Sequence, residues 1–168
     1  NAGKIQQIAQ FKGGQSNPTY KISTDKKNFV LRRKPPGILL PSAHAVDREY
    51  KVMTALKDTD VPVPTTYGLC TDRDVIGTEF FIMDFLDGNI YWDLLLTNKL
   101  PEERKLIYLH KNKVISELHK VDYAAVGLSD YGKPGSYIAR QVSRWTKQYL
   151  ASQTEEIEAM NKLIDWLP

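Results

Sequence analysis

Three features of the first fifty residues have the types and the order that phosphate chemistry needs. Residues 13–17 form a glycine-rich turn between two candidate strands, Arg32 lies near the end of a third strand, and Glu49 lies on the helix that follows. Backbone N–H groups of a glycine turn can approach phosphate oxygens because no Cβ intervenes. A cation on the third strand neutralises those oxygens, and a carboxylate on the helix holds the cation in place. This order predicts the front end of a phosphoryl-transfer site.

Arg32 is the expected phosphate-binding cation. It shares a strand face with Val30, because side chains alternate along a strand, so both are expected to point into one cleft. An arginine keeps its charge permanently, and its planar fork can bind two phosphate oxygens at once. Each feature alone has a plainer explanation: Gly13 and Gly14 as a hairpin turn, Arg32 as a surface residue of an edge strand, and Glu49 as a solvated helix charge. Only their combined order favours the phosphate site.

The elements that position these residues are predicted from hydrophobic periodicity. Short β-branched and aromatic runs, broken by turn residues, predict five strands with one helix after the third, and helical periodicity dominates from residue 91. The strands are expected at 5–11, 19–23, 29–33, 66–71 and 79–86, and the helices at 42–57, 91–98, 101–120, 138–152 and 154–167.

The fold class follows from that order. Ser42 is the expected cap of the first helix, and a stripe that includes Val46 and Tyr50 is its expected buried side. Strands followed by helices predict an α+β fold with a five-stranded antiparallel sheet and one helix in the first lobe. The expected division places a nucleotide-binding lobe at residues 1–87 and the first helices of an incomplete helical lobe at residues 88–168.

Composition places the chain among ordinary soluble domains. It has 42% hydrophobic and 26% charged residues, which excludes a disordered tail, and its net charge of +3 gives no argument for a nucleic-acid partner. Its apolar runs are shorter than the ~18 residues of a membrane span, and residues 1–10 lack the pattern of a signal peptide, so an intracellular protein is expected. With a single cysteine and no Cys/His cluster, no metal site is expected within the chain.

Seven stretches spread over almost the whole length carry a family resemblance; they are residues 11–20, 30–37, 39–50, 61–64, 76–88, 118–122 and 141–149. They resemble the aminoglycoside phosphotransferase, or choline kinase-like, superfamily, whose fold is kinase-like. The resemblance is strongest to the phosphotransferase domains that share one chain with acyl-CoA dehydrogenase domains in animals. It implies that ATP and Mg²⁺ are used to phosphorylate a hydroxyl group of a small molecule, for which a hydroxyacyl-CoA is a candidate.

The resemblance also implies roles for particular residues. Arg32 and Glu49 become the phosphate-anchoring pair, and Val30 faces the nucleotide. The backbone of Asp84 and Leu86 meets the adenine edge. The implied nucleotide loop consists of Gly13, Gly14, Gln15, Ser16 and Asn17, and the implied hinge between the lobes consists of Met83, Asp84, Phe85 and Leu86.

The chain departs from the family pattern at the catalytic loop. The family has a His-Gly-Asp sequence with a later Asn and a metal-binding Asp, but His44, His110 and His119 are not followed by an Asp two positions on. Because Ile164-Asp165-Trp166 follows no such loop, it is expected to be a helix end. No catalytic residue is therefore expected in this chain, the metal ligands are expected beyond Pro168, and the fragment is predicted to be inactive alone. The alternative is a non-catalytic nucleotide-binding or docking module.

One basic helix face is a candidate for substrate binding. Arg140, Arg144 and Lys147 lie opposite the apolar stripe of the helix expected at residues 138–152. Such a face could receive the phosphates of coenzyme A, and the plainer alternative is a solvated charged surface. By resemblance, an acyl-CoA dehydrogenase domain in the same protein is a possible partner, and a mitochondrial or peroxisomal location is compatible with it.

Overall fold

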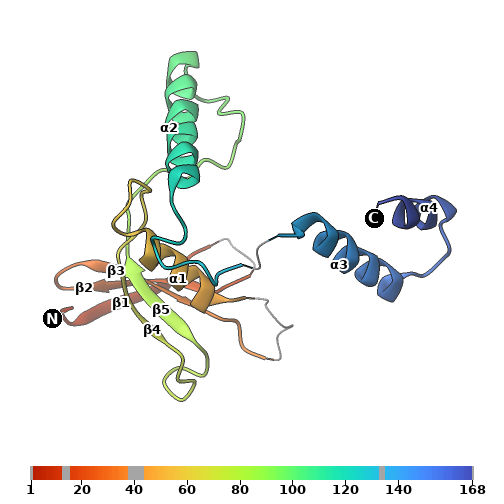
Figure 1. The fold of residues 1–168 in the computed structure, drawn as a ribbon. Helices are drawn as coiled ribbons and strands as arrows, with labels where there is room; N and C mark the ends of the chain where they lie inside the picture. The colour runs from red at the N-terminus through yellow and green to blue at the C-terminus, as the bar shows by residue number, and fades with distance from the viewer. Residues whose placement is uncertain (1, 13–15, 38–43, 133–134, 168) are drawn as a thin grey trace. The chain divides into compact units, whose positions relative to one another are not determined.

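The computed structural model describes residues 2–12, 16–37, 44–132 and 135–167. Within these residues, the chain forms three strands, one helix, two further strands and then three helices (Figure 1). The elements are β1 (Ile5–Gln10), β2 (Thr19–Thr24), β3 (Asn28–Arg33), α1 (Val46–Leu56), β4 (Thr66–Cys70), β5 (Phe80–Asp84), α2 (Pro101–Lys120), α3 (Tyr137–Ser152) and α4 (Glu158–Trp166). This order confirms the predicted α+β fold with one helix after the third strand.

The five strands form one antiparallel sheet in the order β1-β2-β3-β5-β4. Arg32 lies opposite Thr19 on β2 and Phe81 on β5, and Val30 lies opposite Met83. Directly opposed residues project from the same face of a sheet, and side chains two apart on one strand do so as well. The register therefore places Val30 and Arg32 on one face, as the strand alternation predicts.

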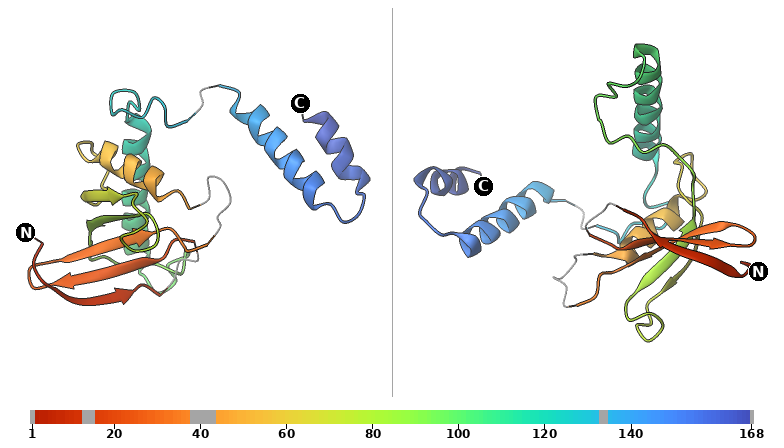
Figure 2. Two further views of the ribbon diagram at one scale, coloured as in Figure 1. Left: turned by 90° about the horizontal axis from the view of Figure 1, so that it is seen from below. Right: turned by 180° about the vertical axis from the view of Figure 1, so that it is seen from behind.

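Helix α1 packs against this face, beside β4 and β5 (Figures 1 and 2). Phe81 and Val46 are fully buried there, and the ring of Tyr50 lies 6.0 Å from the ring of Phe81. Burying a side chain of this kind stabilises a fold by roughly 1.5–3 kcal/mol. This packing positions Glu49, the neighbour of Tyr50, close to the sheet face that carries Arg32.

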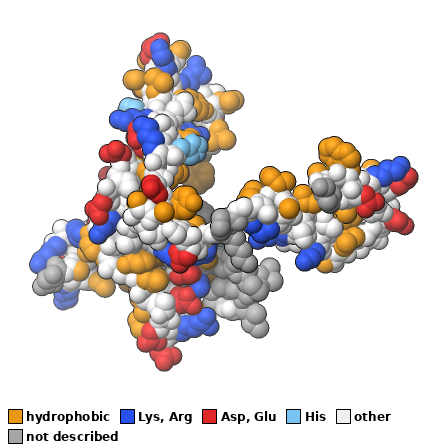
Figure 3. All heavy atoms as spheres, in the orientation of Figure 1, with side chains coloured by type: hydrophobic (Ala, Val, Ile, Leu, Met, Phe, Trp, Pro, Cys, Tyr) orange, Lys and Arg blue, Asp and Glu red, His pale blue; other side chains and the backbone are white. Residues whose placement is uncertain are grey.

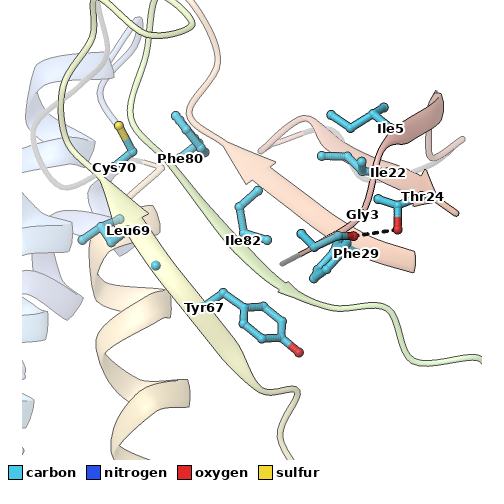
Figure 4. A pocket seen from close by; sticks show the side chains of 12 residues that line it. Gly3, Ile5, Ile22, Thr24, Phe29, Tyr67, Leu69, Cys70, Phe80 and Ile82 are labelled. Carbon is cyan, nitrogen blue, oxygen red and sulfur yellow. Dashed lines mark hydrogen bonds between the residues drawn. The ribbon is translucent and has the colours of Figure 1, made fainter. Parts of the chain in front are cut away.

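The opposite face of the sheet carries an open apolar groove of about 540 Å³. Figure 4 shows residues from all five strands, and from the segment that precedes β1, around this groove. Its larger apolar side chains are Ile5, Ile22, Phe29, Phe80 and Ile82. Ile5 is 56% exposed, so solvent reaches this face, in contrast to the face beneath α1.

The helix expected at residues 91–98 was a wrong prediction, because this segment consists of turns. Asp93 accepts hydrogen bonds from the backbone N–H groups of Leu95 (2.9 Å) and Thr97 (2.7 Å) and from the Thr97 hydroxyl (2.5 Å). These bonds lower the pKa of Asp93, with the Thr97 side chain as the largest cause. A short acidic side chain that binds nearby N–H groups competes with helix formation, and Leu96 accordingly adopts a positive φ of 52°.

Several predicted element ends shift. β5 ends at Asp84, which forms the last register pair with Phe29, rather than at residue 86. Helix α4 begins at Glu158 rather than at residue 154, because Gln153 and Ile157 have extended backbone conformations. Helix α1 begins at Val46, and the predicted cap Ser42 lies outside the described residues.

The chain forms two compact units, Asn1–Leu128 and Ser129–Pro168. Helix α2, in the first unit, has no buried residue, and apolar side chains are exposed on α2 and on the α3–α4 pair (Figure 3). These include Leu106, Leu109, Ile138, Trp145 and Trp166. Among the described helices, none has the length and apolar character needed to cross a lipid bilayer. The functional division at residue 87 stays a prediction.

Candidate functional site

The structure brings Arg32 and Glu49 together as an ion pair with two contacts. The Arg32 Nε donates to Glu49 Oε2 at 2.5 Å, and Arg32 Nη2 donates to Glu49 Oε1 at 3.0 Å. Two parallel bonds fix the guanidinium plane as well as its position. The side chains are 30% and 35% exposed, so the pair is only partly buried and solvent reaches it.

Arg32 also contacts β2 and retains hydrogen-bonding capacity. Its Nη1 donates to Thr19 Oγ1 at 2.9 Å and makes a longer contact of 3.5 Å with the Asn17 carbonyl oxygen. A guanidinium has five N–H groups, two of them on each terminal nitrogen. Within the described part of the chain, one N–H of Nη2 has no partner and can be donated to an anion. The site therefore presents an oriented donor beside a carboxylate that holds it.

Asn17 links the ion pair to the segment before α1. This residue is only 5% exposed, its Nδ2 donates to Glu49 Oε1 at 3.1 Å, and its Oδ1 lies 2.9 Å from His44 Nδ1. Because the amide nitrogen faces the carboxylate, the amide oxygen must face His44, and the proton of His44 is assigned to Nδ1. The sequence analysis considered His44 only as a possible start of the catalytic loop and missed its contact with the predicted nucleotide loop.

The other predicted loop residues are only partly described. Gly13, Gly14 and Gln15 lie outside the described residues, whereas Ser16 is exposed and Asn17 is buried. Of the two loop residues that the structure describes, Asn17 is the one in contact with the ion pair. Its buried amide is a feature that the glycine-centred prediction did not anticipate.

The predicted hinge begins where β5 leaves the sheet. Met83 lies opposite Val30, the Asp84 backbone N–H donates to the Thr65 carbonyl oxygen at 2.9 Å, and Leu86 is 64% exposed. The Phe85 ring stacks on Phe11 at 6.3 Å with an interplanar angle of 15°. The segment thus carries an aromatic side chain, and its residues after Asp84 belong to no strand or helix.

A second cation lies on the same sheet face as Arg32. Lys21 pairs with Val30 in the register, and its Nζ lies 4.2 Å from the centre of the Phe85 ring. A cation at this distance from a ring face is attracted by the ring quadrupole. The sequence analysis missed Lys21 and Thr19. Alternation along β2 puts the two on one face, and the register with β3 shows that it is the face of Arg32.

Arg140 and Arg144 belong to the second unit. They lie four residues apart on α3, both exposed, and Arg140 Nη1 donates to the Gly135 carbonyl oxygen. Their predicted role in substrate binding stays a prediction.

A family comparison decides the class of protein. The sequence profile described as "Phosphotransferase enzyme family" matches residues 7–168, which includes the ion pair, the predicted hinge and all four helices. The chain belongs to the phosphotransferase enzyme family. This membership confirms the resemblance on which the residue roles were based.

Curated relatives of this phosphotransferase domain are much longer proteins. It is 49% identical over 162 residues to acyl-CoA dehydrogenase family member 10 of Mus musculus, which covers 96% of the chain and 15% of that relative. Identity is 50% to the probable acyl-CoA dehydrogenase IBR3 of Arabidopsis thaliana and 44% to acyl-CoA dehydrogenase family member 11 of Homo sapiens, with 95% of the chain and 20% of each relative covered. The chain thus spans about a fifth or less of these proteins.

A solved structure supports the kinase-like fold. The crystal structure of a protein described as an aminoglycoside phosphotransferase, from Ralstonia eutropha, is 51% identical to this domain and superposes with a TM-score of 0.84. The match covers the whole chain and 48% of the crystallised protein. The phosphotransferase domain therefore corresponds to about half of that fold.

No cluster of three metal-ligating side chains is found among the described residues. Magnesium binds through carboxylates and other oxygen ligands, and the described part of the phosphotransferase domain contains no group of three acidic, histidine or cysteine side chains able to hold a metal ion.

Replacing Asn17 with leucine is expected to lower the free energy of unfolding by about 1–3 kcal/mol. The variant leaves His44 Nδ1 and one Glu49 oxygen without the amide that each contacts, and an unsatisfied buried group costs about this much. Urea unfolding measures the change. Ser16→Ala, at the exposed neighbouring position, is the matched control with little expected effect. If Asn17→Leu were as stable as the wild type, the contacts of Asn17 with Glu49 and His44 would not contribute to stability as expected.

Proposed function

We propose that this chain is the nucleotide-binding part of an ATP-dependent phosphotransferase that phosphorylates a hydroxyl group of a small molecule. The observation that carries this proposal is the two-contact pair between Arg32 and Glu49, which leaves one guanidinium N–H without a partner among the described residues. Phosphoryl transfer depends mostly on positioning and charge neutralisation, and an oriented guanidinium supplies both to a phosphate. Family membership supports the same reaction class.

The described residues have separate roles in this proposal. Arg32 binds phosphate oxygens of ATP, while Glu49 and Asn17 hold the guanidinium in place through the bonds already given. The loop at residues 13–17 covers the phosphates. Val30 lies over the nucleotide base, and the backbone of residues 84–86 meets the adenine edge. Mg²⁺ accompanies the nucleotide, and its protein ligands are expected outside this chain.

The acceptor proposed for the longer protein is a hydroxyacyl-CoA. Support comes from the relatives in mouse, Arabidopsis and human, whose names place them among acyl-CoA dehydrogenase proteins and of which the matched segment is a fifth or less. A dehydrogenase domain in the same protein would then be the partner of the phosphotransferase domain. Arg140 and Arg144 on α3 are candidates for contact with the phosphates of coenzyme A, because both are exposed and cationic.

A non-catalytic nucleotide-binding module is the second candidate function. The sequence favours it in one respect, because no histidine is followed by an aspartate two positions on. Such a module would keep the Arg32–Glu49 pair and bind ATP, but the protein containing it would transfer no phosphoryl group.

The 168-residue chain is expected to bind ATP without turning it over. Binding is measured by displacement of a fluorescent ATP analogue, and transfer by release of ADP in the presence of magnesium and a hydroxyacyl-CoA. The longer protein that includes the segment after Pro168 is expected to transfer phosphate, whereas its inactivity would favour the binding module. Absence of ATP binding by the chain would overturn the proposed function, and turnover by the chain alone would overturn the assignment of catalysis to other residues.

A further inference from the structure

Three polar side chains meet on the sheet face opposite Arg32, at the start of the predicted hinge. Asp84 is the last residue of β5, Tyr67 lies on β4, and Lys27 lies in the turn between β2 and β3. The Tyr67 hydroxyl donates to Asp84 Oδ1 at 2.5 Å and accepts a hydrogen bond from Lys27 Nζ. Lys27 Nζ also lies 3.3 Å from Asp84 Oδ1. One carboxylate is thus held by groups from two other elements.

Aromatic packing fixes the geometry of this cluster. The Tyr67 ring meets the Phe29 ring edge to face at 5.4 Å, and Phe29 is 6% exposed. Figure 4 shows Tyr67 and Phe29 beside the apolar groove, on neighbouring parts of the sheet. Lys27 Nζ lies 4.4 Å from the Tyr67 ring centre and 4.8 Å from that of Phe29. The phenol therefore has a defined orientation, and its hydroxyl is aimed at Asp84.

The same contacts act on the ionisation of Asp84. Its pKa is lowered, mainly by the hydrogen bond from Tyr67, with further contributions from Thr65 and Lys27. The carboxylate is therefore held as an anion that accepts several hydrogen bonds. An exposed Lys–Asp pair alone contributes little, but a charge-assisted bond from a packed phenol restrains its acceptor more strongly.

Asp84 connects this cluster to the backbone of the hinge. Its N–H donates to the Thr65 carbonyl oxygen at 2.9 Å, and its side chain projects away from Arg32, because it pairs with Phe29 in the register. The next residues leave the sheet and have no strand partner. The position of the peptide groups at residues 84–86 therefore depends on how firmly Asp84 is held.

We propose that Tyr67 is a positioning residue that acts through Asp84 to hold the backbone of residues 84–86 against the adenine edge of a bound nucleotide. This inference rests on the proposed function and deepens it, because it assigns base preference to a side chain on the sheet face opposite Arg32. Adenine offers an amino donor and a ring-nitrogen acceptor at this edge, whereas guanine offers a carbonyl acceptor and a ring N–H donor. A backbone held in one position discriminates between these two patterns, and a loosened one discriminates less.

The decisive measurement is the ratio of the dissociation constants for GTP and ATP. Both nucleotides carry the same triphosphate, so the contribution of Arg32 cancels in the ratio. The wild-type chain is expected to prefer ATP, and Tyr67→Phe, which removes only the hydroxyl, is expected to reduce the preference on the order of fivefold by weakening ATP binding. Lys27→Met, which leaves the bond from Tyr67 to Asp84 intact, is expected to give a smaller change in the same direction.

Thr54→Val is the matched control. The Thr54 hydroxyl lies 2.7 Å from the Thr66 hydroxyl and ties β4 to α1, not to Asp84. Its loss is expected to alter thermal stability and to leave the GTP-to-ATP ratio unchanged. A wild-type chain without base preference, or an unchanged ratio in Tyr67→Phe, would overturn the positioning role. An equal change in Tyr67→Phe and Thr54→Val would also overturn it, because it would indicate general loosening of the sheet.

Hydrogen exchange separates this inference from the proposed function. In the nucleotide-free protein, Tyr67→Phe is expected to raise the amide exchange rates of Phe85 and Leu86. If the chain bound neither nucleotide but exchange at these amides rose, the proposed function would be wrong and the restraint on residues 84–86 would stand. If exchange stayed at the wild-type rate, the restraint itself would be refuted.

Discussion

Arg32→Met is expected to weaken ATP binding by on the order of 10- to 100-fold, which corresponds to the loss of one charge-assisted hydrogen bond. Methionine keeps much of the arginine stem but removes every N–H group. It also leaves the Glu49 carboxylate without its cation, so that a negative charge faces the phosphates. The variant therefore loses an attraction and gains a repulsion. Isothermal titration with ATP measures the change.

Two further variants test this explanation. Arg33→Met makes the same change of charge at the next residue, which projects from the other face of β3, and is expected to leave ATP binding near wild type. Adding Glu49→Gln to Arg32→Met removes the carboxylate that has lost its cation, and is expected to recover part of the affinity for ATP. A double-mutant cycle quantifies this coupling. Equal losses in Arg32→Met and Arg33→Met would show that only the overall charge matters.

Phe81→Ala is expected to lower the free energy of unfolding by about 3–5 kcal/mol, the usual cost of emptying a buried phenylalanine site. Phe81 is fully buried beneath α1, in contact with Tyr50, and it lies opposite Arg32 in the register. A cavity here loosens α1 and with it the position of Glu49. ATP binding is therefore expected to weaken together with stability, as measured by urea unfolding and titration.

Phe80→Ala is the matched control for the core. Phe80 is the preceding residue of the same strand, but it lines the open groove on the other face and is only half-buried. Its truncation is expected to cost clearly less stability and to leave ATP binding unchanged. A larger loss in Phe80→Ala than in Phe81→Ala would show that the principal packing lies on the groove side of the sheet.

The pairing of Arg32 with Glu49 was predictable because local periodicity determines both positions. Alternation along β3 selects the face of Arg32, and the helical stripe of α1 determines which side meets the sheet, so that Glu49 follows from its place beside Tyr50. The strand order of β1, β2 and β3 was predictable for a similar reason, because short turns connect consecutive antiparallel strands.

The contacts that the sequence analysis missed are those between distant segments. Asn17 meets His44 across 27 positions, and Tyr67 meets Asp84 across 17 positions, and neither pair shares a repeating pattern. The helix predicted at residues 91–98 was wrong for a different reason. There the apolar spacing fits a helix, but Asp93 binds the N–H groups that a helix would use, so a side-chain competitor overrode the pattern.

The presence of an arginine rather than a lysine at position 32 has a practical consequence for chemical labelling. Many reagents that mark ATP sites deliver an electrophile to a nearby lysine amine. A guanidinium stays protonated in folded proteins and offers no such nucleophile, so Arg32 would escape acylation. Lys21, on the same sheet face and close to Phe85, is the amine that such a probe would reach. An ATP-directed acylating probe is therefore expected to label the peptide that contains Lys21.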